Sequence, residues 1–463
     1  MTGHRFDPTI LREYDIRGIV GETLHEADAH ALGRAYAKIL TENGGKSVAV
    51  GRDGRLSSPM LEAALVEGLS DSGIDVVRIG LGPTPMLYFA GHTLGVDGAL
   101  MVTGSHNPGN HNGFKLMLGK KSLYGEGIKR LGAIAAAGDF VSGKGRVSKH
   151  AVKDDYIARL LQDFQGGREL TVAWDAGNGA TGEVLQALAA RLPGRHVLLN
   201  EVIDGRFPAH HPDPTEPENL IQIQEVIKRS SCDFGIAFDG DGDRIGVVDG
   251  EGNILWGDQL LVILAREVVA AKPGAQIIAD VKASQVLFDE IAKMGGKPLM
   301  WRTGHSLIKS KMAETGAPLA GEMSGHIFYA DRYYGYDDAL YAAIRLLSIA
   351  SRAKESVTEM RRNLPAVVNT PELRIPCDDT RKFAVIGEVK TRLSQAGATV
   401  SDIDGVRVGA EGGWWLLRAS NTQAVLVARA EAPDRAKLDR LIGQLTAQLK
   451  ESGVAMPPLP THS

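Results

Sequence analysis

The chain of 463 residues has little cysteine and no excess of positive charge. Its two cysteines, Cys232 and Cys377, lie far apart in the sequence, so we expect neither a disulfide framework nor a thiolate metal site, and we interpret both as packing residues. The formal net charge is -4, whereas domains that bind nucleic acid usually carry a basic face. We therefore expect no nucleic-acid partner.

Long hydrophobic runs are missing as well. The most apolar stretch, LLVILAREVVA at 260–270, is interrupted by Arg266 and Glu267, and a membrane-spanning helix needs about 20 apolar residues. The N-terminal stretch MTGHRFDPTI lacks the charged and then apolar order of a secretion signal. We therefore expect a cytoplasmic protein that has no membrane partner.

The sequence does contain a repeated alternation of short β-branched runs and helical stretches. This order predicts βαβαβ units with a mostly parallel sheet. It starts near residue 47 and restarts at TVAWD (171–175) and IIADV (277–281), whereas the chain after about residue 380 predicts a helix, two adjacent strands and a final helix. We expect an α/β fold of three similar mixed-sheet domains and a smaller α+β domain, at 1–150, 151–253, 254–367 and 368–463.

The acidic loop FDGDGDR is the most informative motif. Asp239, Asp241 and Asp243 alternate with glycines between two apolar strands, so three carboxylates share one tight loop. Two unit charges about 4 Å apart repel by roughly 4 kcal/mol at an effective dielectric constant near 20, so a hard divalent cation such as Mg²⁺ is the expected counter-ion. A solvent-facing turn is the alternative. A calcium EF-hand does not fit, because its sixth and twelfth positions would be Arg244 and Gly250.

Three further loops carry polar groups that suit a sugar phosphate. RASNTQ (418–423) offers a guanidinium, hydroxyls and an amide for a phosphate dianion, although a polar hairpin loop has the same composition. GEMSGH (321–326) combines a carboxylate, a hydroxyl and an imidazole, as a site for sugar hydroxyls does, although alone it is more typical of a capped turn. RTGHS (302–306) and Lys282 add donors at the ends of predicted strands, where a solvated surface residue is the alternative.

The stretch MVTGSHNP places a serine, Ser105, at the end of an apolar run. It could be a hydrolase nucleophile, a phosphate carrier or a turn residue. Positions 103 and 107 hold threonine and asparagine, so the G-x-S-x-G elbow of α/β-hydrolases is absent. A metal loop, a phosphate loop and a sugar loop in one chain together suit phosphoryl transfer, which needs a hydroxyl to carry the group. We therefore favour the phosphate carrier.

Six motifs in a fixed order carry a resemblance to a known family. They are YDIRG (14–18), TGSHNP (103–108), DGDGDR (239–244), GHS (304–306), GEMSGH (321–326) and RASNT (418–422). Through them the sequence resembles the α-D-phosphohexomutases over nearly its full length, and among these the bacterial phosphomannomutase/phosphoglucomutase branch. The resemblance implies four domains around a central cleft, Mg²⁺ as cofactor, and a hexose 1,6-bisphosphate as intermediate and activator.

The resemblance also implies roles for single residues. Ser105 would be the phosphoserine, and the expected Mg²⁺ ligands are Ser105, Asp239, Asp241 and Asp243. The residues expected at the reaction are Ser105, His106, Lys115, Arg17, Arg244 and His326. Lys115 and His326 are the candidates for proton transfer. The expected substrate-binding residues are Tyr14, Lys282, Gly304, His305, Glu322, Ser324, Arg418, Ser420, Asn421 and Thr422.

From this resemblance we expect a phosphohexomutase of carbohydrate metabolism that interconverts hexose 1-phosphate and hexose 6-phosphate, with mannose and/or glucose as the sugar. We expect a monomer whose partners are small-molecule hexose phosphates. Related phosphoglucosamine mutases usually have Gly in place of Asn421 and Gln in place of Met323, which disfavours an amino sugar here. A phosphoglucosamine mutase, a metal-dependent phosphatase and a non-catalytic sugar-phosphate-binding protein are the alternatives.

Overall fold

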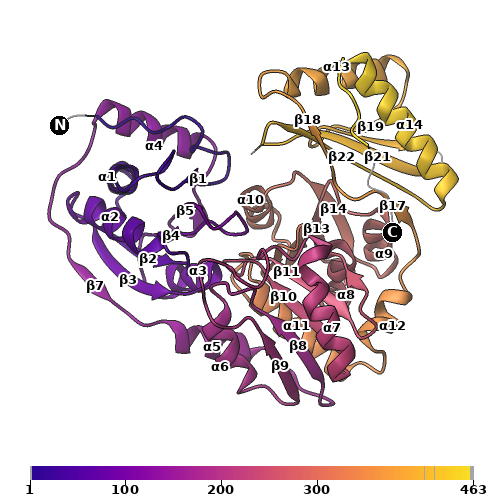
Figure 1. The fold of residues 1–463 in the computed structure, drawn as a ribbon, viewed down its shortest axis with the longest axis horizontal. Helices are drawn as coiled ribbons and strands as arrows, with labels where there is room; N and C mark the ends of the chain where they lie inside the picture. Colours follow the sequence, from indigo (N-terminus) through magenta and orange to yellow (C-terminus); the bar gives the residue numbers. More distant parts are fainter. Residues whose placement is uncertain (1–2, 411, 422, 459–463) are drawn as a thin grey trace.

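The computed structural model of the protein describes residues 3–410, 412–421 and 423–458. Its strands form four separate sheets, which follow one another along the chain (Figure 1). In each of the first three sheets, parallel strands are followed by an antiparallel hairpin. None of the described helices combines the length and the apolarity that a bilayer crossing requires.

The first sheet contains the N-terminal strands of the chain. Its strands are β1 (Ile16–Ile19), β2 (Ser47–Arg52), β3 (Asp75–Leu81), β4 (Gly98–Val102), β5 (His111–Leu118), β6 (Lys121–Ser122) and β7 (Val147–Lys149). The accompanying helices are α1 (Glu26–Glu42), α2 (Ser58–Ser70), α3 (Thr84–Thr93) and α4 (Glu126–Ala137). The order is β1-β5-β4-β2-β3-β7, with β6 beside β5. All five residues of β4 are buried, as expected for an apolar strand with helices on both faces of its sheet.

The second and third sheets are built by the middle of the chain. The second unit comprises α5 (Lys153–Gln162), β8 (Thr171–Asp175), α6 (Gly182–Ala189), β9 (Arg195–Leu199), the 3₁₀ helix η1 (Pro217–Leu220), α7 (Ile221–Ser230), β10 (Phe234–Phe238), β11 (Ile245–Asp249) and β12 (Ile254–Leu255). The third comprises α8 (Gly257–Ala271), β13 (Gln276–Asp280), α9 (Gln285–Lys293), β14 (Lys297–Trp301), α10 (His305–Thr315), β15 (Leu319–Gly321), β16 (Ile327–Tyr329), α11 (Ala339–Arg352) and α12 (Val357–Arg362).

The three sheets share one strand order. It reads β3-β2-β4-β5 in the first, β9-β8-β10-β11 in the second and β14-β13-β15-β16 in the third. The prediction of three similar mixed-sheet α/β domains is therefore confirmed, whereas the residue boundaries at 150, 253 and 367 stay a prediction. The shared order gives each domain an equivalent hairpin loop, which joins β4 to β5, β10 to β11 and β15 to β16.

The fourth domain is an antiparallel sheet with two helices. Its elements are β17 (Val368–Asn369), β18 (Leu373–Pro376), α13 (Lys382–Gln395), β19 (Thr399–Ser401), β20 (Val406–Ala410), β21 (Gly413–Ala419), β22 (Val425–Ala432) and α14 (Arg435–Glu451). Trp415 and Leu417 pack in the core that α13 and α14 complete, whereas Trp414 and Leu416 contact Val281 of the third domain, because side chains alternate between the two faces of a strand. The prediction of only two strands after residue 380 was incomplete, since β19 and β20 are short and contain polar residues.

A central cavity lies between the four domains. The largest hydrophobic core runs through the first three and includes Tyr88 of α3, Trp174 of β8 and Leu340 of α11. In Figure 1 the first domain (indigo and purple) lies at the left and the fourth (orange and yellow) at the upper right, with the middle two below the fourth. The cavity has a volume of about 1020 Å³ and is lined by residues of all four domains, among them Ser105 and Arg418.

Candidate functional site

The three equivalent hairpin loops carry the motifs singled out in the sequence. The β4–β5 loop holds Ser105, the β10–β11 loop holds the acidic motif that begins at Asp239, and the β15–β16 loop holds Glu322. Each loop follows a buried strand, so its backbone is anchored at both ends by sheet hydrogen bonds. The repeated fold therefore places a serine, a cluster of carboxylates and a candidate sugar-binding loop at equivalent ends of three sheets.

Ser105 lies buried at the contact between the first two loops. Its Oγ donates to Asp239 Oδ2 over 3.0 Å and lies 3.2 Å from His106 Nδ1. Its φ of 49° is in the left-handed region, which costs free energy for any residue other than glycine and is typical of functional sites. Burial, followed by the charges of Arg244 and Arg17, lowers the pKa of His106 well below its usual value, so this imidazole is neutral beside the serine.

Arg55 supports the serine loop through hydrogen bonds to its backbone, and the sequence did not reveal this residue. Its guanidinium donates to the backbone oxygens of Ser105 at 2.7 Å and of Asn107 at 2.6 Å, and also to those of Pro108 and His111. Asp53 lies 3.2 Å from Arg55 Nε and accepts from the backbone N–H of the residue before the serine. A single buried cation therefore organises four carbonyl groups around the nucleophile.

The three aspartates of the second loop form a buried acidic triad. Asp239, Asp241 and Asp243 are fully buried and offer oxygen atoms that lie within 4.8 Å of one another. Burial, and then the charges of Asp241 and Asp243, raise the pKa of Asp239 well above its usual value. Asp241 Oδ1 and Asp243 Oδ1 are buried without a hydrogen-bond partner. Unsatisfied hard oxygen atoms at this spacing fit a divalent cation such as Mg²⁺.

Lys115 of β5 neutralises part of this triad. Its Nζ lies 2.7 Å from Asp241 Oδ2 and contacts Asp243 Oδ2 more closely still. Burial acts to lower the pKa of Lys115, but the two carboxylates outweigh burial and raise it above its usual value. The residue expected to transfer protons is therefore held as an ammonium ion against the predicted metal ligands.

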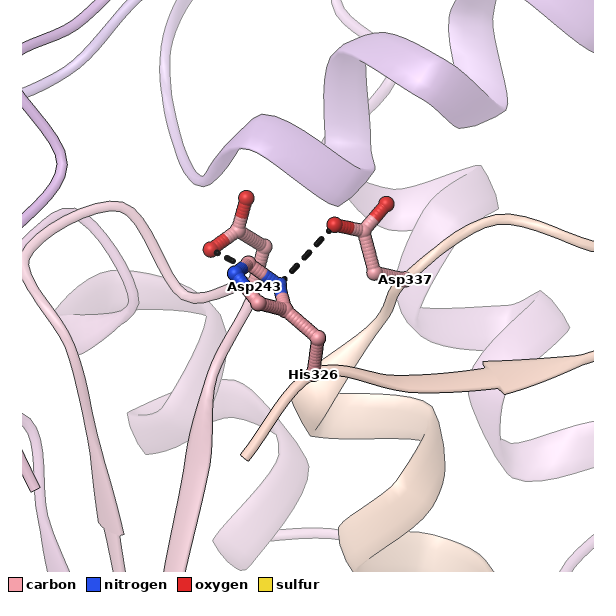
Figure 2. A group of neighbouring side chains, drawn as sticks. All are labelled: Asp243, His326 and Asp337. Atoms are coloured by element: carbon pink, nitrogen blue, oxygen red, sulfur yellow. Dashed lines mark ion pairs between the residues drawn. The ribbon is translucent and has the colours of Figure 1, made fainter. Parts of the chain in front are cut away.

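His326 and Arg244 meet across the second and third loops. Arg244 Nε donates to His326 Nε2 over 3.1 Å, and the backbones of the two residues pair in an isolated bridge. The other ring nitrogen, Nδ1, lies 3.0 Å from Asp337 Oδ2 and 3.6 Å from Asp243 Oδ1 (Figure 2). Asp337 was not singled out in the sequence, where the pair of aspartates at 337 and 338 resembles an ordinary helix cap.

The third loop holds the predicted sugar-binding groups. Glu322 Oε1 accepts from the backbone N–H of Gly304 over 2.5 Å, and Ser324 Oγ donates to Glu322 Oε2 over 3.1 Å. Tyr14 links the first, third and fourth domains, because its hydroxyl donates to Thr303 O at 2.8 Å and accepts from Asn421 Nδ2 at 2.6 Å. These residues line the cavity.

Two cationic residues of the cavity lining, one from the third domain and one from the fourth, have carboxylate partners that the sequence did not predict. Lys282 Nζ lies 2.9 Å from Glu372 Oε2, and Arg418 Nε donates to Asp404 Oδ2 over 2.9 Å. The charge of Lys282 lowers the pKa of Glu372 to about 2, so this glutamate is ionised at neutral pH. A bound phosphate would have to share these cations with the two carboxylates or displace them.

The structure brings nearly all predicted residues to one cavity. Those that line it are Tyr14, Arg17, Ser105, His106, Lys115, Arg244, Lys282, Gly304, His305, Glu322, Ser324, His326, Arg418, Ser420 and Asn421. Arg17 Nη1 donates to Asn107 Oδ1 over 3.0 Å, beside the serine. The acidic triad lies behind the lining, next to Ser105, and Thr422 lies outside the described residues.

Four family models match the chain in sequence order. The phosphoglucomutase/phosphomannomutase alpha/beta/alpha domains I, II and III match residues 8–140, 154–252 and 256–368, and the C-terminal domain matches 372–448. The chain belongs to the phosphoglucomutase/phosphomannomutase family. Its four domains and their order are thus those of the family, which confirms the resemblance found in the sequence.

Curated and solved members of the family cover nearly the whole chain. A phosphomannomutase/phosphoglucomutase of Pseudomonas putida is 45% identical over 95% of this chain and 95% of its own. A phosphoglucomutase of Neisseria meningitidis is 43% identical over 96% of this chain and 97% of its own. The crystal structure of a phosphoglucomutase/phosphomannomutase family protein from Burkholderia thailandensis is 42% identical and covers 99% of both chains, with a TM-score of 0.92.

Proposed function

We propose that the protein is a phosphohexomutase that interconverts hexose 1-phosphate and hexose 6-phosphate, with mannose and/or glucose as the sugar. One observation carries the proposal: the buried Ser105 hydroxyl touches the acidic triad and opens into the same cavity as Arg418 of the fourth domain. A nucleophile at one end and a guanidinium at the other suit a ligand with two phosphate positions. Family relatives at 42–45% identity that are named phosphomannomutase/phosphoglucomutase support the same function.

The reaction that we propose starts from Ser105 in its phosphorylated form. A free hydroxyl of the bound hexose phosphate attacks phosphorus, the bond between phosphorus and Ser105 Oγ breaks, and a hexose 1,6-bisphosphate forms. The hydroxyl gives up its proton and Ser105 Oγ takes one up. His326 and Lys115 are the two groups proposed for these transfers, with His326 as acceptor, because the ammonium of Lys115 already carries its proton. The reverse transfer, from the other end of the sugar, returns a phosphoryl group to Ser105.

Residues around the serine compensate the negative charge of the transferring phosphoryl group. Asp239, Asp241 and Asp243, together with a phosphorylated Ser105, would hold Mg²⁺, which when bound offsets negative charge on the transferring group. Arg17 and Arg244 line the cavity at the same end and add fixed positive charge. The protein therefore needs no solvent reorganisation to stabilise the charge that develops during transfer.

The far end of the cavity would hold the phosphate that does not react. Arg418, with Ser420, Asn421 and the neighbouring Lys282, supplies donors there, while Glu322 and Ser324 accept and donate toward sugar hydroxyls. Because the bisphosphate must turn around between the two transfers, these groups have to bind the sugar in two orientations. Small hexose phosphates are the proposed partners, and the monomeric state and cytoplasmic location stay predictions.

The direct test measures turnover of glucose 1-phosphate, mannose 1-phosphate and glucosamine 1-phosphate, each with Mg²⁺ and a catalytic amount of hexose 1,6-bisphosphate. We expect the wild type to form the 6-phosphate of glucose, mannose or both. Ser105→Ala should lower kcat by at least about 1,000-fold, and Ser148→Ala, on the exposed edge strand β7, should leave it unchanged.

Two other outcomes would contradict the proposal. Inorganic phosphate released in step with substrate consumption, with no isomer formed, would identify a phosphatase. A wild-type protein that turns over none of the three sugars, and whose intact mass shows no phosphoryl adduct that is lost on adding hexose phosphate, would be a binding protein. Turnover of glucosamine 1-phosphate alone would identify the protein as a phosphoglucosamine mutase.

A further inference from the structure

A buried carboxylate stands behind the imidazole of His326. Asp337 lies between β16 and α11, is fully buried, and is absent from the cavity lining that includes His326. Its Oδ2 lies at an ion-pair distance of 3.0 Å from His326 Nδ1 (Figure 2), and among the described residues neither atom has another partner in hydrogen-bond geometry. The histidine thus presents one ring nitrogen to the interior of the third domain and the other toward the second domain.

The partner of the second nitrogen fixes the tautomer of the ring. Arg244 Nε donates to His326 Nε2 over 3.1 Å, and an arginine Nε carries a hydrogen and cannot accept one. His326 Nε2 must therefore be the unprotonated nitrogen. In the neutral imidazole the remaining proton is then on Nδ1, which faces Asp337.

Other contacts hold Asp337 in place for this role. Lys309 of α10 lies with its Nζ 2.9 Å from Asp337 Oδ1, and the same ammonium lies 4.5 Å from the centre of the Tyr88 ring. The two possible competitors are farther away, because His305 Nδ1 is 3.7 Å from Asp337 Oδ2 and Asp243 Oδ1 is 3.6 Å from His326 Nδ1. Among the described residues, Asp337 is the nearest carboxylate to His326 Nδ1.

We propose that Asp337 is the positioning residue of His326: it keeps the proton on Nδ1 and leaves Nε2 free to accept the proton of the attacking sugar hydroxyl. This inference rests on the phosphohexomutase function proposed above. On binding, the substrate phosphate takes Arg244 away from Nε2. Nε2 then gains the hydroxyl proton while the new O–P bond forms, and the imidazolium that results lies beside the carboxylate that stabilises its charge.

The first measurement needs no variant. Nitrogen-15 NMR of the wild-type protein labelled at histidine distinguishes a protonated Nδ1 from a protonated Nε2, and His326→Gln identifies the signal of this residue among the 13 histidines. We expect His326 to be protonated at Nδ1 and unprotonated at Nε2. The opposite tautomer in the folded wild type overturns the proposal, whatever the variants do.

The second measurement compares two neighbouring carboxylates. Asp337→Asn offers His326 Nδ1 an amide donor and so favours the other tautomer. Asp338→Asn is the matched control, because Asp338 is as deeply buried but contacts the hydroxyls of Tyr156 and Tyr333 and caps α11. We expect Asp337→Asn to lower kcat about 100-fold with little change in KM and a changed His326 signal, and Asp338→Asn to leave kcat and that signal as in the wild type.

Each other outcome counts against the inference. Wild-type kcat in a folded Asp337→Asn protein overturns it. An equal loss of kcat in both variants, matched by an equal loss of folded protein, shows a purely structural role and also overturns it. A wild type without any mutase activity would instead refute the proposed function, and the tautomer measurement would still be readable.

Discussion

The β4–β5 loop and the β10–β11 loop occupy equivalent places in two equivalent sheets, yet opposite charges organise them. In the first, the Arg55 guanidinium outside the loop gathers four backbone carbonyls. In the second, Asp239 Oδ1 inside the loop accepts from the backbone N–H groups of Gly242, Asp243 and Arg244 at 2.9 to 3.1 Å. The repeated fold thus supplies the position, and one side chain in each loop decides whether a nucleophile or a carboxylate cluster results.

The two loops also complete each other. The hydroxyl of Ser105 in the first donates to Asp239 in the second, and Lys115, on the strand that follows the first loop, compensates Asp241 and Asp243. Lys115 of the first domain therefore compensates part of the negative charge of the second loop. The compensation is incomplete, because two oxygen atoms of the acidic triad are buried without a hydrogen-bond partner.

The largest effect is expected from removing the organising cation of the first loop. Arg55→Met leaves Asp53 as a buried, unpaired carboxylate and releases four carbonyls, which should cost about 3 to 5 kcal/mol of unfolding free energy. The displaced serine should lower kcat by about 100-fold. Urea unfolding and steady-state turnover measure the two effects.

Arg52→Met is the control for that experiment. Arg52 is three residues away and pairs with Glu62 over 3.2 Å, but a quarter of its side chain is exposed, so its loss should cost no more than about 1 kcal/mol and leave kcat intact. A folded Arg55→Met protein with the turnover of the wild type would show that the serine loop keeps its shape without the guanidinium.

A smaller effect is expected from the corresponding change in the second loop. Asp239→Asn keeps an oxygen for the three N–H groups, whereas Asp239→Ala leaves them buried without an acceptor. In EDTA, Asp239→Ala should therefore be less stable than Asp239→Asn by about 1 to 3 kcal/mol, as measured by urea unfolding. Both should lose Mg²⁺-dependent turnover. Equal stability of the two variants would mean that the loop does not depend on this acceptor.

The fold was largely predictable because alternating β-branched runs and helices have distinct periodicities. What the sequence could not show is that the loops after β4, β10 and β15 are equivalent, since the three domains share a strand order and no visible identity. The edge strands β1 and β7 were also missed. β1 has four residues, too few for its alternating burial to stand out in the sequence, and β7 has three residues that are all exposed.

The site was predictable where residues are close in sequence and not where they act at a distance. The acidic triad stands out because three carboxylates share one loop. Arg55 does not, because its partners are backbone carbonyls about fifty residues away that no side-chain pattern reveals. Asp337 precedes a helix cap and resembles one, and Glu372 becomes notable only when Lys282 is found beside it. Charge pairs between residues that are far apart in the sequence become visible only in the three-dimensional structure.

The smallest effect is the dependence of stability on pH that the acidic loop should confer. Without metal, burial and the two neighbouring carboxylates raise the pKa of Asp239 well above the 3.8 of an ordinary aspartate, so its folded form keeps a proton that the unfolded chain loses. Stability tied to such a group is complete below pH 3.8 and is lost as pH rises through the raised value. The pKa of Asp241 is shifted downward, so Asp241 stays ionised and adds no slope above pH 5.

We therefore expect the increase in Tm on adding Mg²⁺ to grow by a few degrees as the pH rises from 3.8 through the raised pKa of Asp239. The guanidinium of Arg55 stays charged throughout, but burial lowers the pKa of His106 in the first loop, so that loop adds stability as the pH rises, which is the opposite sign. Thermal unfolding at four pH values, with EDTA and with Mg²⁺, measures the difference. Asp239→Asn should reduce it to the part that Asp243 contributes, because burial and Asp241 also raise the pKa of Asp243. An increase in Tm that is the same at every pH would show that the triad is already neutralised by Lys115, and the expected contrast in sign between the two loops would be lost.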